Sequence, residues 1–159
     1  MEGGFIRNIG LDNVEITGNR YVGGLVGEFV FFVPSYGKYG EAAVWNCYTD
    51  VSVSGDRFIG GLTGGASTFR ITPIESDEYD DVIPEFAGIY ESFSVGQVAG
   101  QSSTGGFIGG GYAEYTQSNY WDRESSDQNQ WIGRIPMILW TRPRCRSSGL
   151  IPRGVFLAR

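Results

Sequence analysis

Two carboxylates near residue 120 have the type and spacing that acid–base chemistry on a sugar chain would use. Asp122 and Glu124 are two residues apart, and on one face of a strand their Cα atoms would lie about 6–7 Å from each other at a rise of ~3.3 Å per residue. Paired carboxylates can act as acid and base in glycoside hydrolysis. They also need a cleft that perturbs them, which spacing alone does not show.

Other catalytic groups are missing from the sequence. The chain has no histidine, which removes serine and cysteine triads and the usual zinc sites. No serine or cysteine stands in a nucleophile motif. We therefore predict no catalytic residue and no enzymatic activity. A polysaccharide-acting hydrolase or lyase that uses paired carboxylates is the alternative.

A run of acids could in principle bind calcium, which takes six to eight oxygen ligands. The run has no central glycine and no closing glutamate at the twelfth place, so it is not an EF-hand loop. A solvated acidic loop is the prediction, with no metal and no cofactor. The acids of this run are Glu75, Asp77, Glu78, Asp80, Asp81 and Glu85.

Aromatic residues cluster earlier in the chain and could stack on sugars or insert into a partner. Alternation places Phe29, Phe31 and Val33 on one face and Val30 and Phe32 on the other. At least one face is therefore expected to be buried, and core or inter-loop packing is favoured over a ligand platform. We predict that any binding uses this cluster and the acidic run. The candidate binding residues are Phe31, Tyr36, Tyr39, Asp77, Asp80 and Asp81.

A glycine-rich phrase that occurs three times must position these groups. Residues 21–27 read YVGGLVG, residues 58–64 read FIGGLTG, and residues 104–109 read TGGFIG. Gly60 follows Gly23 by 37 residues (60 − 23) and Gly105 follows Gly60 by 45 (105 − 60). Such a period is typical of stacked-repeat proteins. No Lys-Ser/Thr follows the phrases, so they are not phosphate loops. The predicted structural glycines are Gly18, Gly23, Gly24, Gly27, Gly55, Gly60, Gly61, Gly64, Gly100, Gly105 and Gly106.

Alternating segments precede each phrase and predict strands with one face inward. The residues expected to point inward are Val14, Ile16, Val51, Val53 and Val98. The glycine after each segment suits a corner with positive φ, and the paired glycines suit a second short strand where neighbouring backbone approaches closely. Variable loops are expected at 28–45 and 65–90. They should lie near each other on one side because they follow corresponding glycine phrases, and repeat proteins often bind through such insertions.

Composition agrees with an all-β chain. Glycine makes up 25 of 159 residues, about twice the usual ~7%, and aromatic and β-branched residues are plentiful. No apolar run approaches the ~20 residues of a membrane span, and the start lacks a signal-peptide pattern. Two cysteines make no disulfide framework, and Cys47 is expected to be a small buried hydrophobe.

Charge divides the chain in two. All eighteen acids lie at or before Asp127 with six basic residues (6 − 18 = −12), and six arginines follow with no acid. The acidic body disfavours nucleic acid as a partner. We expect a repeat region at 1–132 and a basic irregular tail at 133–159, which contains a segment similar to an engineered cleavage linker.

Several phrases together resemble the GLUG motif repeats of bacterial cell-surface and secreted proteins. They are YVGGLVG at 21–27, FIGGLTG at 58–64, the lead-in NCYTDVSVSG at 46–55 and SFSVGQVAG at 92–100. The segment SNYWDRESS at 118–126 is similar to the phrase that often closes such arrays. The resemblance covers about residues 4–127 and implies a β-solenoid in an adhesin-like protein. It also implies that Asp122 and Glu124 cap and hydrogen-bond.

We therefore expect an all-β chain, a β-solenoid of about three glycine-rich repeats. Its expected function is structural or adhesive, as a binding module of an extracellular or cell-surface protein. Expected partners are a host or matrix protein or a glycan, together with adjacent repeats or domains of the parent chain. We predict no nucleic acid partner and no membrane span in this chain.

Overall fold

The computed structural model describes residues 4–33, 42–70, 88–111 and 116–133, and these are mostly strands. The prediction of an all-β chain is confirmed. One short helix, α1 (Arg123–Ser126), lies near the end of the described chain. The strands are β1 (Phe5–Arg7), β2 (Gly10–Thr17), β3 (Arg20–Gly23), β4 (Val26–Val33), β5 (Ala43–Trp45), β6 (Tyr48–Gly60), β7 (Thr63–Arg70), β8 (Gly88–Tyr90), β9 (Phe93–Val95), β10 (Val98–Gly105), β11 (Thr116–Gln117) and β12 (Tyr120–Trp121).

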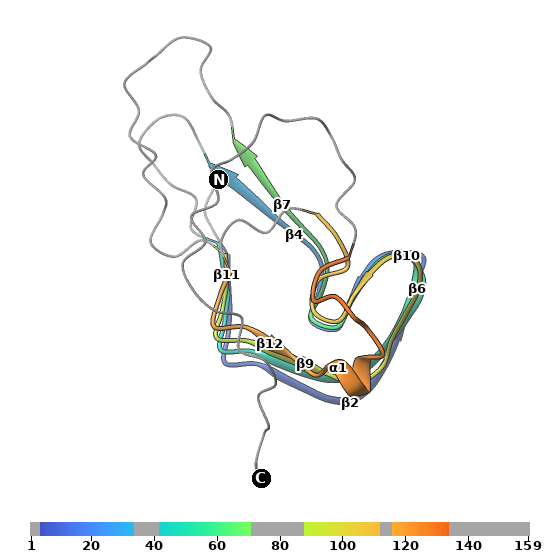
Figure 1. The fold of residues 1–159 in the computed structure, drawn as a ribbon. Coiled ribbons are helices and arrows are strands. Elements are labelled where there is room, and N and C mark those ends of the chain that lie inside the picture. The colour runs from blue at the N-terminus through green and yellow to red at the C-terminus, as the bar shows by residue number, and fades with distance from the viewer. Residues whose placement is uncertain (1–3, 34–41, 71–87, 112–115, 134–159) are drawn as a thin grey trace.

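The strands form three parallel sheets. One sheet has the order β1-β5-β8-β11, and a short one pairs β4 with β7. In the largest sheet β6 pairs with β2 and β3 on one side and with β9 and β10 on the other, and β9 also pairs with β12. Figure 1 shows the strands of successive segments lying over one another around a shared bent path. We refer to 4–33 as repeat 1, 42–70 as repeat 2, 88–111 as repeat 3 and 116–133 as the closing segment.

Pairing register follows the spacing of the glycine phrases. Gly23 pairs with Gly60, and Gly60 pairs with Gly105, which are the separations of 37 and 45 residues found in the sequence. The closing segment continues the stack, because Tyr120 pairs with Phe93. The phrase expected to close the array at 118–126 thus lies in a fourth, shorter segment in register with the three repeats.

The predicted inward positions are buried in repeats 2 and 3. Val51, Val53 and Val98 are all at most 2% exposed. Val14 is 39% exposed, so the prediction that its side chain is shielded is wrong. Val14 pairs in register with Val51, but β2 has no described strand on its other side to cover this position.

The glycine phrase forms a bend between two strands, which differs from the predicted second strand. Strand β3 ends at Gly23 and β4 begins at Val26, and β6 ends at Gly60 where β7 begins at Thr63. The bends stack closely, since a Cβ placed on Gly24 would lie 2.2 Å from the carbonyl oxygen of Gly61. The backbone ladder continues through them, because Gly24 N donates to that same oxygen at 3.2 Å.

Gly18, Gly55 and Gly100 do not have the positive φ that the corner prediction gave them. The positive φ lies three residues later, at Tyr21, Phe58 and Ser103. The glycines are close to neighbouring atoms instead. A Cβ on Gly55 would lie 2.5 Å from the carbonyl oxygen of Gly18, and one on Gly100 would lie 2.3 Å from Thr104 Oγ1. Lack of space, not backbone conformation, explains glycine at these positions.

A second set of corners joins the first strand of each segment to the next. Asn8, Asn46, Glu91 and Ser118 occupy them, all with φ between 48° and 56°. Asparagine adopts this left-handed conformation more readily than most residues. The corners remain bonded to the next segment, since Asn8 N donates to Trp45 O and Asn46 N to Tyr90 O, both at 3.1 Å.

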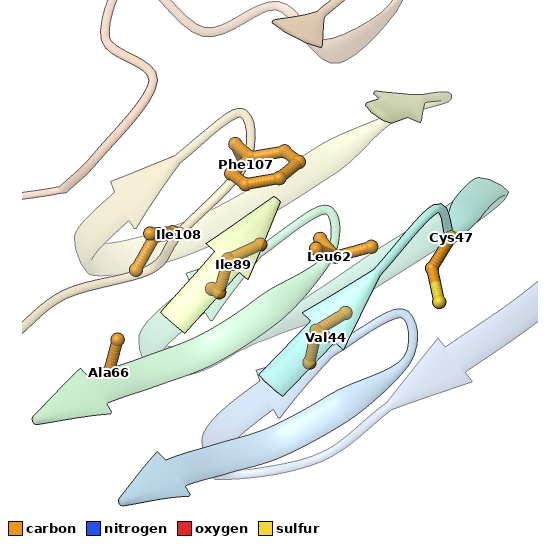
Figure 2. Packing of buried hydrophobic residues seen from close by; sticks show 7 residues of the cluster. All are labelled: Val44, Cys47, Leu62, Ala66, Ile89, Phe107 and Ile108. Carbon is orange, nitrogen blue, oxygen red and sulfur yellow. The ribbon is translucent and has the colours of Figure 1, made fainter. Parts of the chain in front are cut away.

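The core is made by side chains from successive segments. In Figure 2, Leu62 and Phe107 come from two stacked bends, and Val44 and Ile89 lie on neighbouring parallel strands. The other members of this cluster are Cys47, Ala66 and Ile108. Cys47 is 2% exposed, as predicted, and has a free thiol.

Candidate functional site

The predicted binding residues lie largely outside the described chain. Tyr36, Tyr39, Asp77, Asp80 and Asp81 fall in 34–41 and 71–87, and Phe31 is described only through its backbone. The predicted loop bounds were too wide. Residues 28–33 and 65–70 belong to β4 and β7, and residues 43–45 and 88–90 form β5 and β8.

The residues that flank the two insertions are paired with each other. Val33, the last residue of β4, is in register with Arg70, the last residue of β7. Ala43, the first residue of β5, is in register with Gly88, the first residue of β8. Both insertions therefore leave the stack at neighbouring points and return to it at neighbouring points. Figure 1 shows β4 and β7 side by side, ending together. We call these four residues the insertion edge.

The third connection shows how little chain this span needs. Phe29, Ala66 and Gly111 are register partners, so they form one column of the stack. Val44, Ile89 and Thr116 form another. Residues 30–43, 67–88 and 112–115 therefore link the same two columns. Since the four residues 112–115 are enough to join these columns in repeat 3, the first two links contain more chain than this connection requires.

The two carboxylates near residue 120 do not share a strand face, contrary to the geometry assumed for them. Strand β12 ends at Trp121, Asp122 is the N-cap of α1, and Glu124 lies in the first helical turn. Asp122 Oδ1 accepts a hydrogen bond from Glu124 N at 3.0 Å. Both side chains are exposed. In the described chain, this arrangement makes Asp122 a cap of the kind that helix N-termini favour.

An aromatic row on the outer face of the largest sheet was missed by the sequence reasoning. Tyr48, Phe93 and Tyr120 are successive register partners. The Tyr48 and Phe93 rings stack with centroids 5.2 Å apart, and Tyr48 covers Gly10 in repeat 1. Each aromatic of the row lies two residues after a corner residue with positive φ, namely Asn46, Glu91 or Ser118. This shared spacing is visible in the sequence. The stacking stabilises the sheet and leaves Tyr48 and Tyr120 more than one-third exposed.

An arginine pair lies on the same sheet near its second corner. Arg20 and Arg57 are register partners on β3 and β6, and both are exposed. The Arg20 guanidinium lies 4.8 Å from the Tyr21 ring centroid and 5.3 Å from that of Phe58. These rings stack on each other 4.7 Å apart. Stacking of Arg20 on the rings offsets part of the repulsion between two neighbouring cations.

Polar side chains form hydrogen bonds beside the corners at Asn46, Glu91 and Ser118. Ser92 Oγ accepts from Cys47 N at 3.1 Å and donates to Tyr90 O at 2.8 Å. Asn119 Oδ1 accepts from Ser92 N, and its Nδ2 donates to Ile89 O. Cys47, Ser92 and Asn119 therefore occupy equivalent positions in successive segments, with a thiol, a hydroxyl and an amide as their side-chain groups. This column is structural, because its polar atoms bond to the backbone of the stack.

Within the described ranges, no group of three or more His, Cys, Asp and Glu side chains could hold a metal ion. No helix there is long and apolar enough to cross a membrane. Comparison with known protein families, characterised proteins and solved structures finds no match to this chain.

Proposed function

We propose that this chain is a non-catalytic β-solenoid module of an extracellular or cell-surface protein, and that its two long insertions form a binding surface. The observation that carries the proposal is the insertion edge. Val33 is paired with Arg70 and Ala43 with Gly88, so the two insertions begin and end beside each other. The link at 112–115 supports it further, because the stack does not need the extra chain of the other two links.

The sequence of the insertions suggests the class of partner. The first contains Tyr36 and Tyr39, and the second contains Asp77, Asp80 and Asp81. Aromatic anchors beside charged groups are typical of protein interfaces, and aromatic rings also stack on sugars. A host or matrix protein with a basic surface, or a glycan, is therefore the partner we propose. The likeness to GLUG repeats supports placement at a bacterial surface.

The test is a glycan and host-protein binding screen with two double variants. Tyr36→Ala/Tyr39→Ala removes aromatic groups from the first insertion, and Asp80→Asn/Asp81→Asn removes two negative charges from the second without changing its size. Each is expected to abolish binding while the urea midpoint of unfolding stays unchanged. The matched control is Tyr120→Ala, an exposed aromatic of the closing segment outside both insertions.

Binding that survives both double variants would place the site elsewhere and refute the proposal. Turnover of a polysaccharide that is lost with Asp122→Asn or Glu124→Gln would establish the enzymatic alternative. Asp122→Asn is a sharp variant for this purpose, because asparagine also caps helices well. Loss of turnover in it could not be attributed to loss of the cap.

A further inference from the structure

The edge of the stack formed by repeat 1 exposes apolar residues whose register partners in repeat 2 are buried. Val14 is 39% exposed, and its register partner Val51 is 2% exposed. Ile9 is 43% exposed, and Cys47, which lies opposite it between the pairs Arg7–Trp45 and Gly10–Tyr48, is 2% exposed. The columns are the same and the residues are similarly apolar. Exposure differs because repeat 2 has a neighbour on both sides and repeat 1 has a described neighbour on one.

Main-chain pairing at the repeat 1 edge is one-sided. Strands β1, β2 and β3 each pair with one described strand, in repeat 2. At the other end of the stack, side chains of the closing segment bond to the edge of repeat 3. Gly96 N donates to Ser125 Oγ at 3.0 Å, and Gln128 Nε2 donates to Val98 O at 2.8 Å. One end is capped by α1 and the residues after it, whereas the described residues provide no such cap at the repeat 1 edge.

We propose that the repeat 1 edge, formed by β1, β2 and β3, is a docking surface for one further repeat of the same kind, stacked parallel to repeat 1. The interface would continue the one between repeats 1 and 2. Each existing column would gain one member, and Ile9 and Val14 would become as buried as Cys47 and Val51. This inference does not depend on what the insertions bind.

The geometry of the bends specifies the chemistry of the occupant. A Cβ on Gly24 would lie 2.2 Å from Gly61 O, and one on Gly61 would lie 2.4 Å from Gly106 O. The corresponding residue of a repeat docked on the repeat 1 edge would approach the Gly24 carbonyl in the same way. It therefore needs glycine in this column. The columns of Ile9 and Val14 accept small or apolar residues, since repeats 2 and 3 place Cys47 and Ser92 in the first and Val51 and Gly96 in the second.

A second copy of the chain fits this edge poorly. Its other end is covered at Gly96 and Val98 by residues after β12. Its own repeat 1 edge could meet this edge only through a two-fold axis that reverses the strand direction. The lead-in strand β1 has three residues and β2 has eight, so a reversed copy would not align the corners. The bulge at Asn13 and the exposed Asp12 and Glu15 also disfavour pairing with an unmatched strand.

The experiment adds the missing neighbour. A duplicate of residues 4–41 is joined directly before residue 4 of the full chain. Gly4 occupies the place of Ala42, because Ala43 N donates to Gly4 O and Phe5 pairs with Ala43. The join therefore repeats the native passage from repeat 1 to repeat 2. The probe is hydrogen exchange at the amides of β2, measured together with the urea midpoint and the molar mass in solution.

We expect the exchange rate of the β2 amides to fall to about one-tenth or lower in the extended protein, since paired strand amides exchange only through opening. We also expect a higher urea midpoint. The matched control is the same extended protein with Gly24→Val in the added copy only, which should restore fast exchange. Val14→Lys in the original repeat 1 should leave the unextended chain unchanged and remove the gain in the extended one.

Three outcomes would overturn the proposal. In the first, β2 exchanges equally fast in the extended protein and in its Gly24→Val control. In the second, the extended protein unfolds at a lower urea concentration than the original chain. In the third, the original chain is a dimer at micromolar concentration with β2 already protected, which would make a second copy the occupant.

Discussion

Replacing Gly61 by valine is expected to lower the free energy of unfolding by about 2–4 kcal/mol. A Cβ at this position would lie 2.0 Å from Ser94 Oγ and 2.4 Å from the carbonyl oxygen of Gly106. Ser94 is 1% exposed and cannot swing into solvent, and Gly106 belongs to the backbone of the next bend. Overpacking of a core typically costs about 1–3 kcal/mol. Displacing the bend also weakens the adjacent bond from Leu62 N to Phe107 O, which adds about 1 kcal/mol.

Urea unfolding followed by tryptophan fluorescence measures this effect. With a slope of about 2 kcal/mol per molar urea, the midpoint should fall by about 1–2 M. Gly24→Val is expected to behave similarly, because its Cβ would meet Gly61 O. Gly4→Val is the matched control, since a Cβ there has no atom within 4 Å. Equal midpoints for Gly61→Val and Gly4→Val would show that the glycine phrase is not a packing device.

Two further substitutions test polar and aromatic contacts of the stack. Asn119→Ala removes the acceptor for Ser92 N and the donor to Ile89 O, so the free energy of unfolding should fall by about 1–3 kcal/mol; an unchanged urea midpoint would contradict this role. Arg20→Ala removes a guanidinium 4.8 Å from the Tyr21 ring and should cost at most about 1 kcal/mol at this exposed site. A thermal melt at low and high salt should show a small shift that changes with salt, because the attraction to the ring and the repulsion from Arg57 are both electrostatic; a shift that is the same at both salt concentrations would contradict this role.

Register was the part of the fold that the sequence predicted best. The phrases around Gly23, Gly60 and Gly105 repeat because their backbones must approach a neighbour closely, and such a need fixes residue type at one position in every repeat. The pairs Gly23–Gly60 and Gly60–Gly105 follow directly. Burial followed from alternation at Val51 and Val98 and failed at Val14. Alternation shows which face a residue is on but does not show whether a neighbour covers it.

Conformation at the corners was the least predictable part. Asn8 and Asn46 have a residue type that suits positive φ, but Glu91, Tyr21 and Phe58 share that conformation without any such preference. Stacking between repeats imposes it on them. The candidate site was predictable as two insertions on one side of the stack, because they follow corresponding glycine phrases. Their pairing at Val33 with Arg70 could not be inferred without the strand β4, which had been assigned to a loop.

The stack also has a direction that bears on how the chain folds during synthesis or export. Strand β6 pairs with strands of repeat 1 and of repeat 3, and β9 with β6 and β12, so every described pairing of these strands joins segments adjacent in the chain. A repeat that has just emerged can dock on the one before it without waiting for distant sequence. Repeat arrays with only nearest-neighbour contacts can nucleate locally and propagate. Vectorial delivery from the N-terminus would then let each repeat act as the template for the next.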